Sequence, residues 1–112
     1  KLTGQVWMGG LLGKAPIVEG IEIHGAPQMI QLSLDGARLY VTTSLLSTWD
    51  NQFYPDIRDK GGQMFLVHCD VEKGGMHLDP GFLVDFGQEP KGPARAHETR
   101  YPGGDCSSDI WI

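Results

Sequence analysis

Two side chains in this sequence are candidates for metal or sulfur chemistry, His97 and Cys106. His97 lies in the tripeptide Ala96-His97-Glu98, so a carboxylate neighbours a potential metal ligand. Imidazole is a good ligand for copper, and a carboxylate can orient such a ring from outside the metal's own ligands. The alternative is a hydrogen-bonded histidine that holds no metal. Because one histidine does not make a copper site, His97 is a candidate single ligand whose companions lie elsewhere.

Cys106 follows Gly103-Gly104-Asp105, a turn whose backbone N–H groups could stabilise a thiolate. The thiolate is the form of cysteine that reacts with selenium or sulfur compounds. The negative charge of Asp105 opposes that ionisation, and free cysteines are often simply small buried residues. Both roles stay open for Cys106. With Cys69 as the only other cysteine, the composition favours reduced cytosolic thiols over a disulfide scaffold.

Three further residues, His68, Cys69 and His77, invite interpretation as a metal site. Neighbours in a strand point to opposite faces of a sheet, so His68 and Cys69 are not expected to hold one ion. The sequence also lacks a P-loop, a nucleophile elbow and the spacing of a calcium loop. The sequence therefore predicts no site of these three kinds.

The elements that must position these residues are short strands. Asp35-Gly36 separates two strand-like runs at 29–33 and 38–43, which is the strongest short-range signal of a β-hairpin. In a run at 64–71, alternation places Phe65, Val67, Cys69 and Val71 on one face. Further strands are expected at 5–8, 76–78, 82–86 and 109–112.

Two segments interrupt this pattern. Residues 11–25 are expected to form an irregular loop or an edge hairpin, because glycine and proline break each apolar run. Residues 45–62 form a long excursion with one short helix expected near 56–60, since Pro55 limits helix before it. Together these elements predict an all-β chain of one small domain, with antiparallel hairpins and almost no helix.

The composition limits the classes of partner that are expected. The formal net charge is −5 and no Lys/Arg cluster occurs, so nucleic acid is not an expected partner. The 16 glycines and 7 prolines among 112 residues indicate a turn-rich chain without the bias of a disordered one. No apolar run approaches the roughly 20 residues of a membrane-spanning helix.

Many unusual stretches together resemble the selenium-binding protein family, whose members resemble methanethiol oxidases. They cover nearly the whole chain except 11–25, and include Pro27-Gln28-Met29-Ile30-Gln31-Leu32-Ser33-Leu34-Asp35-Gly36, Gln52-Phe53-Tyr54-Pro55, Val84-Asp85-Phe86-Gly87, Ala96-His97-Glu98 and Arg100 through Ile112. The resemblance implies the C-terminal part of a seven-bladed β-propeller, of which residues 1–112 would supply roughly two blades and be incomplete alone.

The resemblance also implies a function. Methanethiol would be oxidised by dioxygen and water to formaldehyde, hydrogen sulfide and hydrogen peroxide, with copper as cofactor, selenium bound, and His97 as one metal ligand. The resemblance further implies a cytosolic and nuclear location, peripheral membrane association and a role in intra-Golgi protein transport. Two alternatives stay open: a non-catalytic selenium- or thiol-binding protein, and an inactive truncated chain that self-associates through exposed strand edges. Relative to the family, the 11–25 loop is expected to be shortened.

Overall fold

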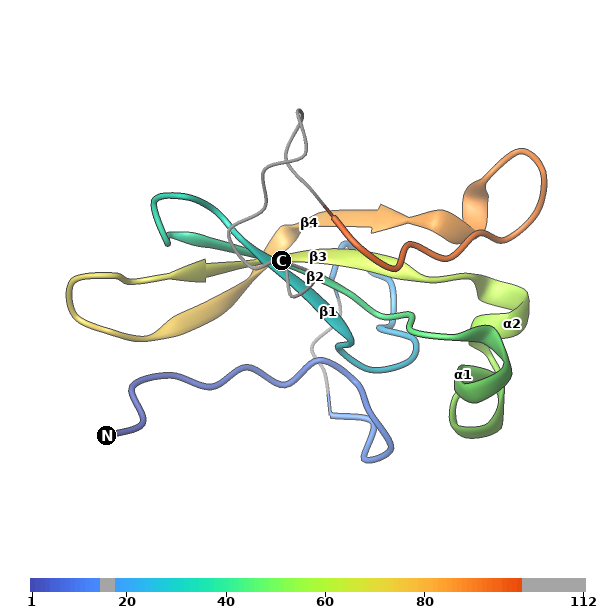
Figure 1. Ribbon diagram of the computed structural model, residues 1–112, viewed down its shortest axis with the longest axis horizontal. Coiled ribbons are helices and arrows are strands. Elements are labelled where there is room, and N and C mark those ends of the chain that lie inside the picture. The colour runs from blue at the N-terminus through green and yellow to red at the C-terminus, as the bar shows by residue number, and fades with distance from the viewer. Residues whose placement is uncertain (15–17, 100–112) are drawn as a thin grey trace, which may run out of the picture.

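The computed structural model describes residues 1–14 and 18–99. One antiparallel sheet dominates it, with the strands in sequence order (Figure 1). The elements are β1 (Met29–Leu32), β2 (Arg38–Thr42), α1 (Ser47–Phe53), α2 (Ile57–Lys60), β3 (Gln63–Cys69), β4 (Met76–Asp85) and the 3-10 turn η1 (Phe86–Gln88). The all-β expectation is confirmed. Cys106 and the strand expected at 109–112 lie outside the described residues.

The β1–β2 hairpin forms where the sequence predicts it. Ser33 N–H donates to the Arg38 carbonyl at 2.8 Å, and the Asp35 carboxylate accepts from Ala37 N–H at 3.0 Å. Gly36 has φ of +72°, a left-handed conformation that glycine adopts without steric cost. The turn is thus fixed by local chemistry.

Strand β4 differs from expectation. The sequence suggests two strands, 76–78 and 82–86, but the structure has one strand with a bulge. Val67 pairs with Leu78 and Phe65 pairs with Leu83, so four β4 residues lie opposite Leu66 alone. Pro80 and Gly81 lie in this bulge, where missing hydrogen bonds and backbone freedom are tolerated.

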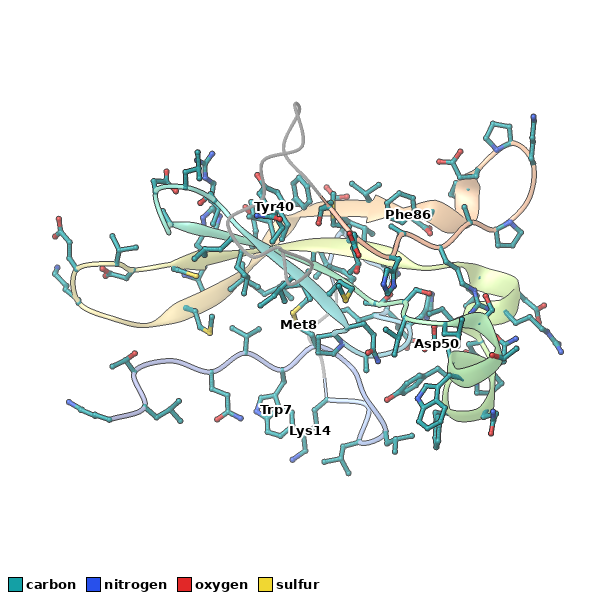
Figure 2. All side chains as sticks on the ribbon, viewed as in Figure 1. Trp7, Met8, Lys14, Tyr40, Asp50 and Phe86 are labelled. Carbon is teal, nitrogen blue, oxygen red and sulfur yellow. The ribbon has the colours of Figure 1, made fainter. Side chains whose placement is uncertain are left out.

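The core lies between one face of the sheet and the N-terminal segment, residues 1–14 and 18–28. Figure 1 shows this segment crossing below the strands, and Figure 2 shows Met8 lying between the segment and the sheet. Phe65 and Val67 are fully buried, and Cys69 packs against them, as alternation predicts. Val71 does not join them, because β3 ends at Cys69 and Val71 is 65% exposed in the turn that follows.

Two expectations about local structure were wrong. Residues 5–8 are not a strand: Met8 faces the core and Trp7 faces solvent, but no described strand pairs with them. The excursion at 45–62 holds two helices; α2 matches the one expected, whereas α1 was not expected. Among the described residues no helix is long and apolar enough to cross a membrane.

Candidate functional site

His97 lies in an extended segment, residues 94–99, that runs past the end of β2. Gly62 N–H donates to the Ala94 carbonyl at 2.9 Å and anchors the start of the segment. Thr42 Oγ1 donates to the His97 carbonyl at 2.8 Å, which ties the segment to the sheet. The half-buried His97 ring approaches the Ser44 carbonyl through Nδ1 at a long 3.4 Å.

A buried carboxylate lies next to this segment. Asp50, on α1, is 1% exposed and accepts hydrogen bonds from Ser44 Oγ at 3.1 Å and Leu45 N–H at 3.0 Å. The Arg95 guanidinium lies 3.7 Å from Asp50 Oδ2 and donates to Asn51 Oδ1 at 2.6 Å. We call Ser44, Asp50, Asn51 and Arg95 the polar corner. It joins α1 to the segment that carries His97 (Figure 2 labels Asp50).

The polar corner is incompletely hydrogen-bonded. Within residues 1–14 and 18–99, Asp50 Oδ1, Arg95 Nη1 and Thr99 Oγ1 are buried without a hydrogen-bond partner. Buried polar atoms usually have partners, so such atoms mark positions where another group can bind. Sequence reasoning missed the corner, because only the fold brings Asp50 and Arg95 together.

At this location the described residues provide one imidazole, that of His97, and not a complete metal site. No group of three His, Cys, Asp or Glu side chains converges in a way that could hold a metal ion, within the part of the chain that the structure describes. A ring that turns one nitrogen toward a backbone carbonyl is a common arrangement for metal-binding histidines. The geometry of His97 fits a single-ligand role.

The sheet brings together two of the second group of candidates, His68 and His77, but not Cys69. His68 and His77 lie directly opposite each other on β3 and β4, with ring centroids 5.0 Å apart. Asp79 Oδ2 lies 2.8 Å from His68 Nε2. Cys69 is a free, half-buried thiol on the opposite face, so it is separate from this pair, as the sequence predicts. No sequence pattern indicated that Asp79 would lie beside His68.

The four-stranded antiparallel meander places the chain among all-β proteins, and it is consistent with one blade of a β-propeller. The chain belongs to the 56kDa selenium binding protein (SBP56) family, whose model matches residues 1–112.

Individual relatives support this family assignment. The chain is 55% identical to methanethiol oxidase from Homo sapiens over 100% of its length, and 54% identical to selenium-binding protein 1 from Arabidopsis thaliana over 99%. The X-ray structure of a hypothetical selenium-binding protein from Sulfolobus tokodaii superposes with a TM-score of 0.77 at 46% identity over 98% of the chain.

The chain spans only part of these proteins. It covers 27% of the human relative, 26% of the Arabidopsis relative and 22% of the Sulfolobus chain. The alignment with the human protein runs over 129 positions, more than the 112 residues of the chain. The human relative therefore has residues in this region that have no counterpart here.

Proposed function

We propose that the protein acts as part of a copper-dependent methanethiol oxidase. The observation that carries the proposal is the 55% identity, over the whole chain, to a protein named methanethiol oxidase. The reaction would convert methanethiol, dioxygen and water to formaldehyde, hydrogen sulfide and hydrogen peroxide. Because the chain spans about a quarter of that relative, its residues would contribute to the active site without completing it.

In this proposal His97 supplies one imidazole ligand. Copper, when bound, would supply the one-electron chemistry that dioxygen requires. Thr42 would fix the His97 backbone, and the polar corner would have a positioning role, because its Arg95–Asp50 ion pair holds the preceding residues against α1. Its unpartnered buried atoms would meet groups from the rest of the protein.

The test compares the intact protein with its His97→Ala variant. Copper content is measured by elemental analysis, and hydrogen sulfide and hydrogen peroxide release from methanethiol are assayed in parallel. We expect the variant to lose both bound copper and turnover. Unchanged copper content would reject the ligand role, and no turnover by the copper-loaded intact protein would reject the oxidase proposal itself.

A second function is favoured by the names of the plant relatives, which are selenium-binding proteins. Here the protein would bind selenium through a thiol without turning over methanethiol, with Cys106 as the reactive residue. Selenium retained after incubation with selenite should then fall in Cys106→Ser and persist in Cys69→Ser. Equal retention in the two variants would reject Cys106 as the selenium-binding residue.

A further inference from the structure

The face of the sheet that bears His68 carries a pair of facing imidazoles with an outer carboxylate. His68 and His77 are cross-strand neighbours, and facing residues of an antiparallel pair have Cβ atoms roughly 4.5–5.5 Å apart. Their rings stack at 29°. We propose that His68 and His77 form a bidentate surface site for a divalent transition-metal ion, with Asp79 orienting His68 from outside. This site is separate from the oxidase function proposed above.

The Asp79 contact determines which nitrogen of His68 would bind the ion. Asp79 Oδ1 accepts from Gly81 N–H at 2.8 Å, and Asp79 Oδ2 lies 2.8 Å from His68 Nε2. An ionised carboxylate only accepts hydrogen bonds, so the facing His68 Nε2 carries the proton. In a neutral ring the lone pair then lies on Nδ1. A carboxylate, a histidine and a metal in this order are a common arrangement in metal proteins.

The β4 bulge explains why these three residues meet. Pro80 and Gly81 interrupt regular pairing, and bulges commonly re-aim the side chains beside them. The Asp79 carboxylate spans the bend by accepting from both Gly81 and His68. The bulge thus holds the carboxylate against the His68 ring.

The surroundings tolerate a cation. Arg38 lies opposite His68 on the other neighbouring strand, but its guanidinium is 3.0 Å from Asp35 Oδ2, which offsets its charge. The His68 side chain is 39% exposed and His77 is exposed, so water can reach both rings.

Binding requires a small rearrangement. Each nitrogen lone pair lies in its ring plane, and the two planes are only 29° from parallel. The lone pairs therefore do not converge on an ion between the rings, so the His77 ring must turn toward His68 Nδ1. An exposed side chain changes rotamer on a picosecond-to-nanosecond timescale. Two protein ligands would leave the other coordination positions to water. Imidazole pairs suit Ni²⁺, Cu²⁺ and Zn²⁺.

The site lies apart from His97. Thr42, which bonds the His97 carbonyl, pairs with Met64, four residues along β3 from His68. At ~3.3 Å per residue this separation is about 13 Å. Variants at the histidine pair therefore leave the His97 region untouched.

The experiment is a titration of the protein with Ni²⁺, which does not oxidise thiols, followed by NMR of the histidine rings and by calorimetry. We expect the His68 and His77 signals to broaden first. Replacing Asp79→Asn should weaken Ni²⁺ binding about ten- to a hundredfold, the usual effect of losing an outer carboxylate. His77→Gln should weaken it at least as much, whereas His24→Gln should leave it unchanged.

Folding of each variant is checked by its melting temperature without metal, since His77 is exposed and its loss should not destabilise the sheet. Ni²⁺ should raise the melting temperature of the wild type and not that of His77→Gln. Unchanged Ni²⁺ affinity in His77→Gln, or no broadening of the His68 and His77 signals, would overturn the proposal.

Discussion

At the scale of single residues, Asp50 is a buried carboxylate with several polar partners. Its carboxylate is buried at 1% exposure, receives two hydrogen bonds from the chain that leaves β2, and has Arg95 as its charge partner. Burying a carboxylate without compensation is very costly. Removing Arg95 would therefore cost more stability, by leaving the Asp50 charge buried and unpaired, than the ion pair itself contributes.

Replacing Arg95→Met should destabilise the fold by about 3–5 kcal/mol, because the Asp50 charge would be left buried and unpaired. Chemical denaturation measures the change. The matched control is Arg58→Met, which removes an arginine whose ion pair with Asp59 lies at the surface, and should leave stability nearly unchanged. Equal stability of the two variants would contradict the assignment of Arg95 as the partner of Asp50.

A second residue gives the fold a pH dependence. Burial and the nearby charge of Lys60 lower the pKa of His24 below its ordinary value of 6.5. Between the folded and unfolded pKa values the unfolded chain binds more protons, so stability falls as pH drops through 6.5 toward the folded pKa. The melting temperature should fall less between neutral pH and about pH 5 in His24→Gln than in the wild type. An identical fall in both proteins would show that His24 does not contribute.

At the scale of elements, Gln63 attaches the N-terminal segment to the sheet. The fully buried side chain accepts from His24 N–H at 2.7 Å and donates to the Glu22 carbonyl at 3.0 Å. Its own backbone N–H donates to Thr43 Oγ1 at 3.0 Å. One amide thus satisfies two backbone groups of a segment that has no regular strand of its own.

Gln63→Leu should loosen that segment. Each buried backbone group left without a partner costs about 1–3 kcal/mol, so a loss of roughly 2–6 kcal/mol is expected. Hydrogen exchange should rise first at 22–24, ahead of β2 and β3. Gln52→Leu is the control, because the exposed Gln52 side chain donates to the Thr48 carbonyl within its own helix. If exchange rises uniformly across the sheet, Gln63 stabilises the whole core and not this attachment.

The elements also show which features the sequence could predict. The Asp35-Gly36 hairpin and the buried side of β3 depend on neighbours in the chain, and both were predicted. Helix α1 was missed because its inward residue is a charged aspartate, whose burial makes sense only beside Arg95. The His68–His77 pairing was missed because register across β3 and β4 depends on a turn and a bulge that periodicity does not fix.

At the scale of the whole molecule, helix α1 carries an apolar surface that no described residue covers. Leu45, Leu46, Trp49 and Phe53 are 42%, 59%, 55% and 43% exposed, and the rings of Trp49 and Phe53 lie 5.3 Å apart. We call these four residues the α1 patch. Contiguous exposed apolar side chains usually mark a contact surface. The chain spans about a quarter of its relatives, so the rest of such a protein is one partner of the right kind.

The α1 patch predicts that the 112-residue chain, produced alone, associates with itself as its concentration rises. Burying apolar surface removes it from water, and two patches that meet would do so. Sedimentation velocity should show a concentration-dependent increase in mass for the wild type. Leu46→Lys combined with Trp49→Lys should shift the chain toward monomer, since each lysine adds charge where two copies would touch. The control is Leu11→Lys with Leu12→Lys, which changes two leucines that are 73% and 71% exposed outside the patch. If both double variants behave alike, the chain does not associate through the α1 patch, and the contact lies on another surface.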